Sequence, residues 1–169
     1  MTKTKMSGKW ASESISIENI LLDSQNPRIN CGQDSTQTEL RNLLLHTEKI
    51  LDLAKNIVKT NGNMAGERII IILEKGARIV VEGNRRVCAC QLLTNPKLIP
   101  VSYHGKFPAI WEELKARLSS LDADIAPSRG EAEPIITRRH TDPGIERWSP
   151  SAQHRRILKF LNSGKSIDD

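Results

Sequence analysis

Aromatic residues are scarce in this sequence: they make up 4% of its 169 residues, and hydrophobic residues of all kinds make up 38%. This amount of apolar side chain allows one modest core, so we expect one domain with at most a small appendage. No run is long enough for a membrane span, and the lysines near the N-terminus are not followed by the apolar segment of a secretory signal. We therefore expect a cytoplasmic protein without a membrane partner.

Cysteine is also scarce, and the odd count of three argues against a disulfide framework. Cys88 and Cys90 are separated by one residue on a predicted helix, so their side chains point about 200° apart. They cannot share a metal ion, and we interpret both as small core residues. Cys31, in a polar loop, indicates nothing further.

The charge of the chain has only a moderate excess of one sign, with a formal net charge of +5. A basic balance of this size weakly favours a nucleic acid or nucleotide as partner and says nothing about the fold. Internal repeats are lacking as well, so the chain is not a repeat array.

The order of the predicted elements indicates the fold class. β-Branched or alternating segments predict strands, and apolar spacing of three and four residues predicts helices. We expect strands at 14–22, 68–73, 78–82 and 98–101, the last a short edge strand, and helices within 36–59, with the second beginning near Thr47, and at 85–94, 107–121, 133–140 and 149–161. This order predicts an α/β (α+β) fold, in which a small mixed sheet is surrounded by helices.

Composition also suggests the domain boundaries. Residues 1–13 are polar and are expected to form a flexible tail, and residues 14–121 are expected to form the folded domain. The segment 122–133 contains proline, serine and glycine and is interpreted as a linker, followed by a helical C-terminal extension at 134–169.

The most informative stretch is Glu82-Gly83-Asn84-Arg85-Arg86, which joins the predicted strand 78–82 to the following helix. A helix N-terminus carries unpaired backbone N–H groups and the positive end of the helix dipole, so it suits an anion such as phosphate. Cations are unfavourable at this end by roughly 0.3–1 kcal/mol each, so Arg85 and Arg86 suggest a bound anion that offsets the cost. Guanidinium groups also match phosphate oxygens in geometry.

Four motifs follow one another along the chain: Asn26-Pro27-Arg28, the helix 51–57 with Gly62 after it, Glu82-Gly83-Asn84-Arg85-Arg86, and Ile99-Pro100. In this order they resemble the N-terminal domain of the ParB/sulfiredoxin superfamily, over roughly residues 15–105. The pattern in that superfamily is an Asn-Pro…Arg loop, a helix followed by glycine, a strand, a hairpin, and a strand that ends in Gly-Glu-Arg-Arg before a helix.

The position of Asn84 separates this chain from both branches of the superfamily. Sulfiredoxins have a nucleophilic cysteine there, and an amide cannot form their thiosulfinate intermediate, so we do not expect a sulfiredoxin. ParB proteins have a glutamate there, whereas Asn84 is uncharged and can only exchange hydrogen bonds. The substitution leaves nucleotide binding credible and weakens the case for hydrolysis.

The resemblance implies a site for a nucleoside triphosphate, CTP or ATP, with Mg²⁺. Its nucleotide-binding and phosphate-binding residues are expected to be Asn26, Arg28, Gly62, Gly83, Asn84, Arg85 and Arg86. Glu82 and Arg85 are the candidates for catalytic roles, although no general base is evident and any hydrolysis is expected to be slow.

A second, looser match lies in the C-terminal extension. The segment Ile136–His140 and the following Trp148-Ser149-Pro150 resemble the second box of ParB-like proteins. Arg138, Arg139 and His140 either close over the triphosphate from the opposite side, so that the extension closes the site, or form a surface patch. Arg155 and Arg156, on the last predicted helix, are a solvated face or a weak patch facing DNA.

Three functions remain open at this stage. The leading one is a nucleotide-binding domain that switches its conformation or its DNA interaction, with DNA as partner and a homodimer as a possible assembly. The second is a ParB-like DNA nuclease of plasmid or phage conflict, for which the acids are Glu82, Asp142 and Glu146. The third is a DNA-binding or partner-docking module that binds no nucleotide.

Overall fold

The computed structural model describes residues 10–29, 31–32, 34–64 and 68–141. The chain divides into two compact units, Met1–Pro134 and Ile135–Asp169, and the sheet and its packed helices belong to the first. Among the described residues, no helix has the length and apolar character needed to cross a membrane.

The first unit is built on a five-stranded mixed sheet with strand order β1-β5-β3-β4-β2. The pairs β1–β5 and β3–β4 are antiparallel, whereas β2–β4 and β3–β5 are parallel. The strands are β1 (Ala11–Ser16), β2 (Ile20–Leu22), β3 (Ile69–Glu74), β4 (Ala77–Glu82) and β5 (Ser120–Ala126). The predicted mixed sheet is therefore confirmed.

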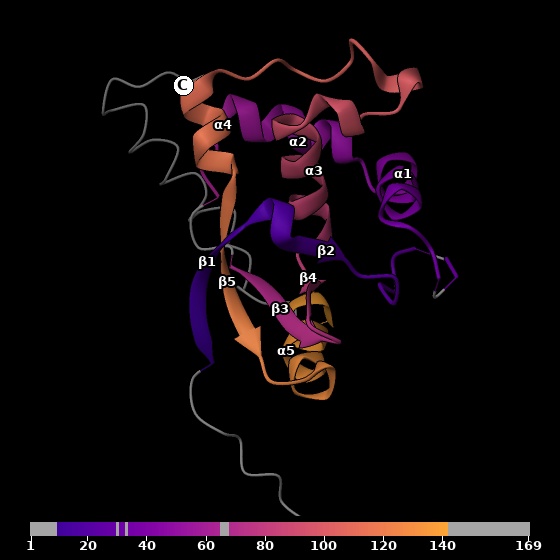
Figure 1. Cartoon of the computed structure of the whole chain (residues 1–169), viewed down its shortest axis with the longest axis vertical. Helices are drawn as coiled ribbons and strands as arrows, with labels where there is room; N and C mark the ends of the chain where they lie inside the picture. The colour runs from indigo at the N-terminus through magenta and orange to yellow at the C-terminus, as the bar shows by residue number, and fades with distance from the viewer. Residues whose placement is uncertain (1–9, 30, 33, 65–67, 142–169) are drawn as a thin grey trace, which may run out of the picture. The chain divides into compact units, whose positions relative to one another are not determined.

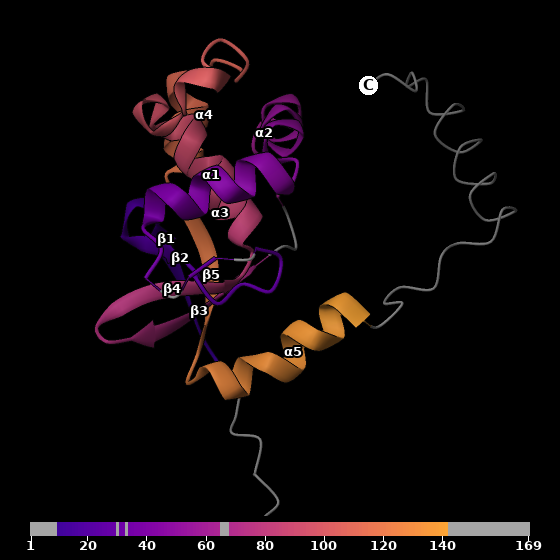
Figure 2. The same cartoon turned by 90° about the vertical axis from the view of Figure 1, so that its right-hand side faces the viewer.

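In the part of the chain that the structure describes, five α-helices and three short 3₁₀ helices accompany the sheet. They are α1 (Gln37–Thr47), α2 (Ile50–Lys59), α3 (Asn84–Thr94), α4 (Glu112–Leu118), α5 (Arg129–Thr141), η1 (Ile17–Asn19), η2 (Pro96–Leu98) and η3 (Val101–Tyr103). Helices α1 to α4 gather together, with α3 among them (Figures 1 and 2). The predicted α/β class, a small mixed sheet with helices around it, is correct.

Helix α3 is the centre of the hydrophobic core. Eight of its eleven residues are buried, including Cys88 and Cys90, which agrees with their interpretation as core residues. The core also takes side chains from α1, α2 and α4 and from one face of the sheet, such as Ile69 and Ile71. A helix that is buried on nearly all sides has a fixed position, so its N-terminus is a rigid point in the fold.

The strands β3 and β4 agree closely with the predicted strands 68–73 and 78–82, and they form a hairpin. Lys75 and Gly76 form its two-residue turn, both with positive φ (51° and 79°), as the favoured hairpin turns require. The hairpin brings β4 back beside β3, and β4 then leads directly into the Gly83 turn and α3.

The segment expected to be a linker contains a strand instead. Residues Ser120–Ala126 form β5, which lies between β1 and β3 and pairs with both. Leu121, Ala123 and Ile125 alternate with two aspartates, which is the pattern of a strand. The first compact unit consequently extends to Pro134 rather than ending at 121, and β1 includes residues 11–13, which were assigned to the tail.

The expected edge strand at 98–101 is also absent from the described structure, where η2 and η3 occupy this region. Pro96 and Pro100 lack a backbone N–H and fix φ near the value of a helical turn, so they favour short 3₁₀ turns over a strand.

Helix boundaries differ at three further places. Helix α4 covers only Glu112–Leu118 of the predicted 107–121, because Trp111 is extended and β5 begins at Ser120. Thr47 does not begin the second helix: its hydroxyl donates to the Leu43 carbonyl in the last turn of α1.

Helix α5 begins earlier than the predicted residue 133. The backbone N–H of Glu131 donates to the hydroxyl of Ser128, which caps the helix, so α5 starts at Arg129 and Pro134 lies inside it. The last predicted helix, 149–161, lies outside the described residues.

Candidate functional site

The turn between β4 and α3 has a geometry that requires glycine. Gly83 has φ of 101°, and a Cβ atom built on it would lie 2.5 Å from Ile69 Cγ2 and 3.3 Å from Arg86 Nη2. The first contact is too close for any side chain, and the second places the Arg86 guanidinium beside the turn. Because Gly83 has no side chain, its backbone can take this conformation, and the guanidinium of Arg86 lies next to it.

Among the described residues, no side chain caps the N-terminus of α3 by a hydrogen bond, and the first turn of the helix contains no acidic residue. The N–H groups of Asn84, Arg85 and Arg86 have no carbonyl within the helix to bond. Together with the positive end of the helix dipole, they form a suitable place for an anion.

A second segment is held at the same edge of the sheet. Strands β2 and β4 are parallel, so the loop after β2 and the turn after β4 leave the sheet side by side. The Asn84 side chain joins them: its Oδ1 accepts a hydrogen bond from the Asp23 N–H (2.9 Å), and its Nδ2 donates to the Val80 carbonyl (2.8 Å). Asn84 is only 5% exposed, so it fixes the loop against the start of α3 from within.

The Asn26-Pro27-Arg28 loop is compact. Asn26 is buried, its Oδ1 accepts from the Arg28 N–H (3.0 Å), and its carbonyl accepts from the Ile29 N–H (3.1 Å). These bonds form a tight turn of the kind that asparagine side chains stabilise. The turn leaves the Arg28 side chain half-exposed, with 44% of its surface accessible.

Glu48, between α1 and α2, brings two of the predicted arginines together. Its carboxylate accepts from Arg28 Nη1 (3.1 Å), and its backbone carbonyl accepts from Arg85 Nε (2.9 Å). Arg28 and Arg85 thus lie around one corner of the molecule, formed by the 23–29 loop, the α1–α2 connection and the start of α3. Arg86 follows Arg85 in the first turn of α3, and its guanidinium lies beside the Gly83 turn. This arrangement of cations can neutralise a multiply charged anion.

Gly62 has a packing role that its position after α2 explains. Asn61, with φ of 53°, is the left-handed residue that caps α2, and the N–H of Gly62, which also has positive φ (71°), donates to the Ile57 carbonyl (2.8 Å). An added Cβ would lie 2.9 Å from Leu114 Cδ1 of α4. The glycine lets α4 approach the end of α2, and its expected contact with a nucleotide stays a prediction.

Glu82 is the last residue of β4 and is half-buried. Among the described residues, no group of three or more His, Cys, Asp and Glu side chains is arranged to hold a metal ion. Asp142 and Glu146, the other acids of the nuclease alternative, lie outside the described residues, as do Arg155 and Arg156. The nuclease and DNA-binding alternatives therefore stay predictions.

Arg138, Arg139 and His140 lie in the last turns of α5 and belong to the second compact unit. Their expected role in closing over a ligand stays a prediction.

Sequence reasoning missed three residues that organise this region: Asp23, Glu48 and Arg129. Asp23 follows a buried strand at the sheet edge, which is a recognisable signal. Glu48 acts partly through its backbone carbonyl, and Arg129 contacts Asp23, which is 106 positions away in the sequence. Neighbouring residues in the sequence therefore give no indication of either role.

The sheet order and the central helix that follows the Gly83 turn define a mixed α/β domain. The C-terminally truncated chromosome-partitioning protein ParB from Caulobacter crescentus, complexed with CTP-gamma-S, has a similar structure, with a TM-score of 0.52 and 14% sequence identity. The match covers 92% of this chain and 66% of that chain. At this identity the similarity shows the fold alone. No protein-family model and no curated protein matches the sequence.

Proposed function

We propose that this protein is a ParB-like nucleotide-binding domain that takes a nucleoside triphosphate, CTP or ATP, at the N-terminus of α3. The observation that carries the proposal is the Gly83 turn, where an uncapped helix start, a left-handed glycine and the guanidinium of Arg86 coincide within the described chain. The solved structure with a similar fold contains a cytidine triphosphate analogue, which supports the same ligand class here.

Each residue of the corner has a role that follows from its geometry. Backbone N–H groups at the start of α3 bind phosphate oxygens, and Arg86 and Arg85 neutralise their charge. Arg28, half-exposed on the 23–29 loop, adds a third cation. Asn84 uses both ends of its amide on Asp23 and Val80, so we assign it the role of holding the loop rather than that of a direct phosphate ligand.

Mg²⁺ is expected with the triphosphate and would be held mainly by phosphate oxygens. Glu82 directly precedes Gly83 in the sequence, so we assign it as a candidate metal ligand or partner of a metal-bound water. Bound there, the ion would neutralise phosphate charge. Hydrolysis and a switch in DNA interaction or dimerisation are further parts of this proposal.

Titration calorimetry tests the proposal directly. Each of the four nucleoside triphosphates is titrated with Mg²⁺ into the parent protein, into Arg85→Ala and Arg86→Ala, and into Arg78→Ala as a control. Arg78 is a half-exposed arginine at the start of β4 that faces Glu13 across 3.9 Å. Because a hydrogen bond to a charged group contributes about 1.5–3 kcal/mol, each site variant should bind about tenfold to a hundredfold more weakly, and the control should bind like the parent.

A thermal melt of each variant accompanies the titration, because Arg85→Ala also removes a hydrogen bond to Glu48. Absence of heat with every nucleotide on the folded parent protein would contradict the proposal. Equal affinity in the parent and both site variants would place the ligand elsewhere.

A further inference from the structure

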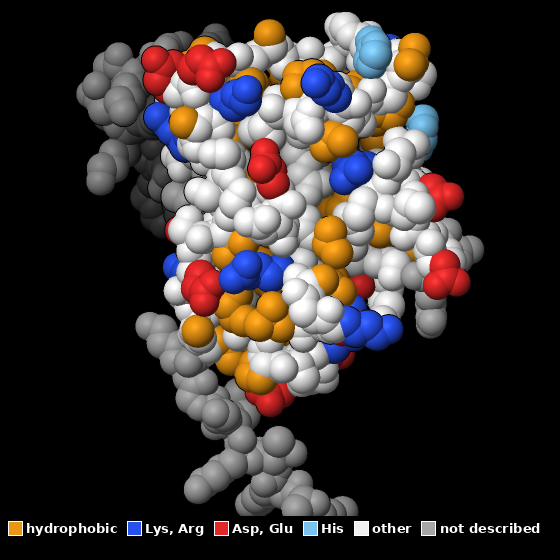
Figure 3. All heavy atoms as spheres, viewed as in Figure 1, with side chains coloured by type: hydrophobic (Ala, Val, Ile, Leu, Met, Phe, Trp, Pro, Cys, Tyr) orange, Lys and Arg blue, Asp and Glu red, His pale blue; other side chains and the backbone are white. Residues whose placement is uncertain are grey.

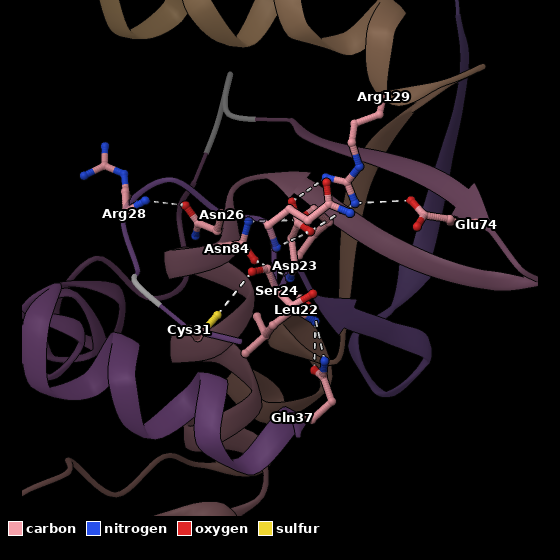
Figure 4. A network of polar contacts seen from close by, with 12 residues as sticks. Leu22, Asp23, Ser24, Asn26, Arg28, Cys31, Gln37, Glu74, Asn84 and Arg129 are labelled. Atoms are coloured by element: carbon pink, nitrogen blue, oxygen red, sulfur yellow. Dashed lines mark hydrogen bonds and ion pairs between the residues drawn. The ribbon is translucent and has the colours of Figure 1, made fainter. Parts of the chain in front are cut away.

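Arg129, the first residue of α5, joins three parts of the first unit. Its Nη1 donates to Asp23 Oδ2 (2.7 Å), its Nη2 donates to Asp23 Oδ1 (3.0 Å), and Nη2 also contacts Glu74 Oε2 (3.2 Å). Figure 4 shows the guanidinium lying between the two carboxylates. It therefore connects the loop after β2, the end of β3 and the start of α5.

Asp23 is the most constrained residue of this network. It is 4% exposed, its Oδ1 also accepts from the Gln25 N–H (3.0 Å), and its own N–H donates to Asn84 Oδ1 (2.9 Å). The hydrogen bonds to Asp23 raise the pKa of Arg129 above its usual range, so the guanidinium is charged at every working pH. Without Arg129, the Asp23 carboxylate would be a buried charge without a cation to balance it.

These contacts form one continuous path. It runs from Val80 on β4 through the Asn84 amide to the Asp23 backbone, and from the Asp23 carboxylate to Arg129. Asn84 holds the backbone of Asp23 from the side of α3, and Arg129 holds the side-chain carboxylate of Asp23 from the side of α5. The 23–29 loop carries Asn26 and Arg28, so its conformation decides where these groups lie.

We propose that Arg129 is a positioning residue for the nucleotide site: its bidentate ion pair with Asp23 holds the 23–29 loop in the conformation that presents Arg28 beside Arg85. The effect on nucleotide binding rests on the proposed function, whereas the effect of Arg129 on the conformation of the loop does not. By reciprocity, a nucleotide that binds only the ordered loop also strengthens the Asp23–Arg129 contact, so the start of α5 responds to the ligand.

The state of the loop can be measured without a ligand, through Cys31. Its thiol donates to the Ser24 carbonyl (3.1 Å) and is half-buried, whereas Cys88 and Cys90 are fully buried in α3. The rate at which a thiol reagent labels Cys31 reports opening of the loop, and the rates at the other two cysteines report global unfolding in the same sample.

The variants are Arg129→Gln, Arg129→Lys, the double variant Asp23→Asn/Arg129→Gln, and Arg78→Gln as a control. Arg129→Gln should raise the labelling rate of Cys31 about tenfold or more, with Cys88 and Cys90 unchanged. Lysine keeps the positive charge but cannot donate the two parallel hydrogen bonds of a guanidinium, so Arg129→Lys should raise the labelling rate of Cys31 by an intermediate amount. The double variant removes the uncompensated charge and should return the rate toward that of the parent.

Calorimetry with Mg²⁺ and the nucleotide that the parent binds then tests the functional half. Arg129→Gln should weaken binding by about tenfold, the double variant should restore part of the loss, and Arg78→Gln should change nothing. If the parent binds a nucleotide and Arg129→Gln binds it equally well, the inference is wrong while the proposed function stands. If Cys31 labelling is the same in the parent and Arg129→Gln, the loop does not depend on Arg129 and the inference is likewise wrong.

Discussion

At the scale of single residues, the proposed site depends on backbone geometry as much as on side chains. Gly83 has a left-handed conformation and packs against Ile69, so no other residue fits there. Its neighbour Asn84 does not face outward but joins β4 to the loop after β2. The corner is therefore fixed on the side of α3 by the Gly83 backbone and the Asn84 side chain.

Gly83→Ala should be strongly destabilising. A left-handed backbone conformation costs a non-glycine residue about 1–2 kcal/mol, and the contact with Ile69 Cγ2 at 2.5 Å adds overpacking of about 1–3 kcal/mol. Urea unfolding measures the change. Gly76→Ala is the matched control, since it has φ of 79° but no atom within 4 Å of the added methyl group, and should show the conformational cost alone. Equal losses in the two variants would contradict the packing argument.

The residue scale also shows what sequence can reveal. The glycine turn before a helix and the two arginines of its first turn are visible in five consecutive letters. The ion pair of Asp23 with Arg129 is not, because it depends on how β2, β3 and α5 meet in three dimensions. Asn84 was expected at a phosphate because its amide can donate, and only the structure shows both ends of that amide engaged.

At the scale of elements, α3 was predicted to within one residue at its start, and the helical region 36–59 contains α1 and α2. Helix α1 begins with a capping box in which the Thr36 hydroxyl accepts from the Glu39 N–H and the Glu39 carboxylate accepts from the Thr36 N–H. Strand β5 was missed because Pro127 and Gly130 next to it suggested a linker, although its apolar and acidic residues alternate. The turn residues that follow β5 were interpreted as part of the same segment, so composition outweighed the alternation that marks the strand.

The capping box gives α1 a stability that depends on pH. Hydrogen bonds from the Thr36 backbone and side chain lower the pKa of Glu39, so its charged form favours the folded state. The contribution is complete above the pKa of an unfolded glutamate, about 4.3, and is lost as the pH falls through the lowered value. Urea unfolding at pH 7 and at pH 3 should show a smaller stability difference between the parent and Glu39→Gln at the lower pH. A difference that does not change with pH would contradict this account.

At the scale of the whole molecule, the core depends on one central helix. Helix α3 is buried by α1, α2, α4 and the sheet, so it can only be exposed when the first unit unfolds. On the face seen in Figure 3, basic and acidic side chains of the described residues are interspersed, so the net positive charge is not gathered there. The proposed site depends on the backbone at Gly83 and on the nearby Arg85 and Arg86, so it does not require a large basic surface.

Thiol labelling of the parent protein should show this organisation. Burial raises the pKa of the Cys88 and Cys90 thiols to about 12, so both lack reactive thiolate in the folded state, whereas Cys31 is partly accessible. One fast and two slow reactions are expected, and the slow pair should react at the rate of global unfolding measured by urea. Rapid labelling of all three thiols in the folded protein would contradict a core centred on α3.

The most direct measurement of the central claim is a structure of the protein with a slowly hydrolysed CTP or ATP analogue and Mg²⁺. The account predicts phosphate density on the backbone of Gly83 and the first turn of α3, with the guanidinium groups of Arg85 and Arg86 turned toward it. Clear density for the nucleotide at another place, with the Gly83 turn and its arginines unchanged, would contradict the account.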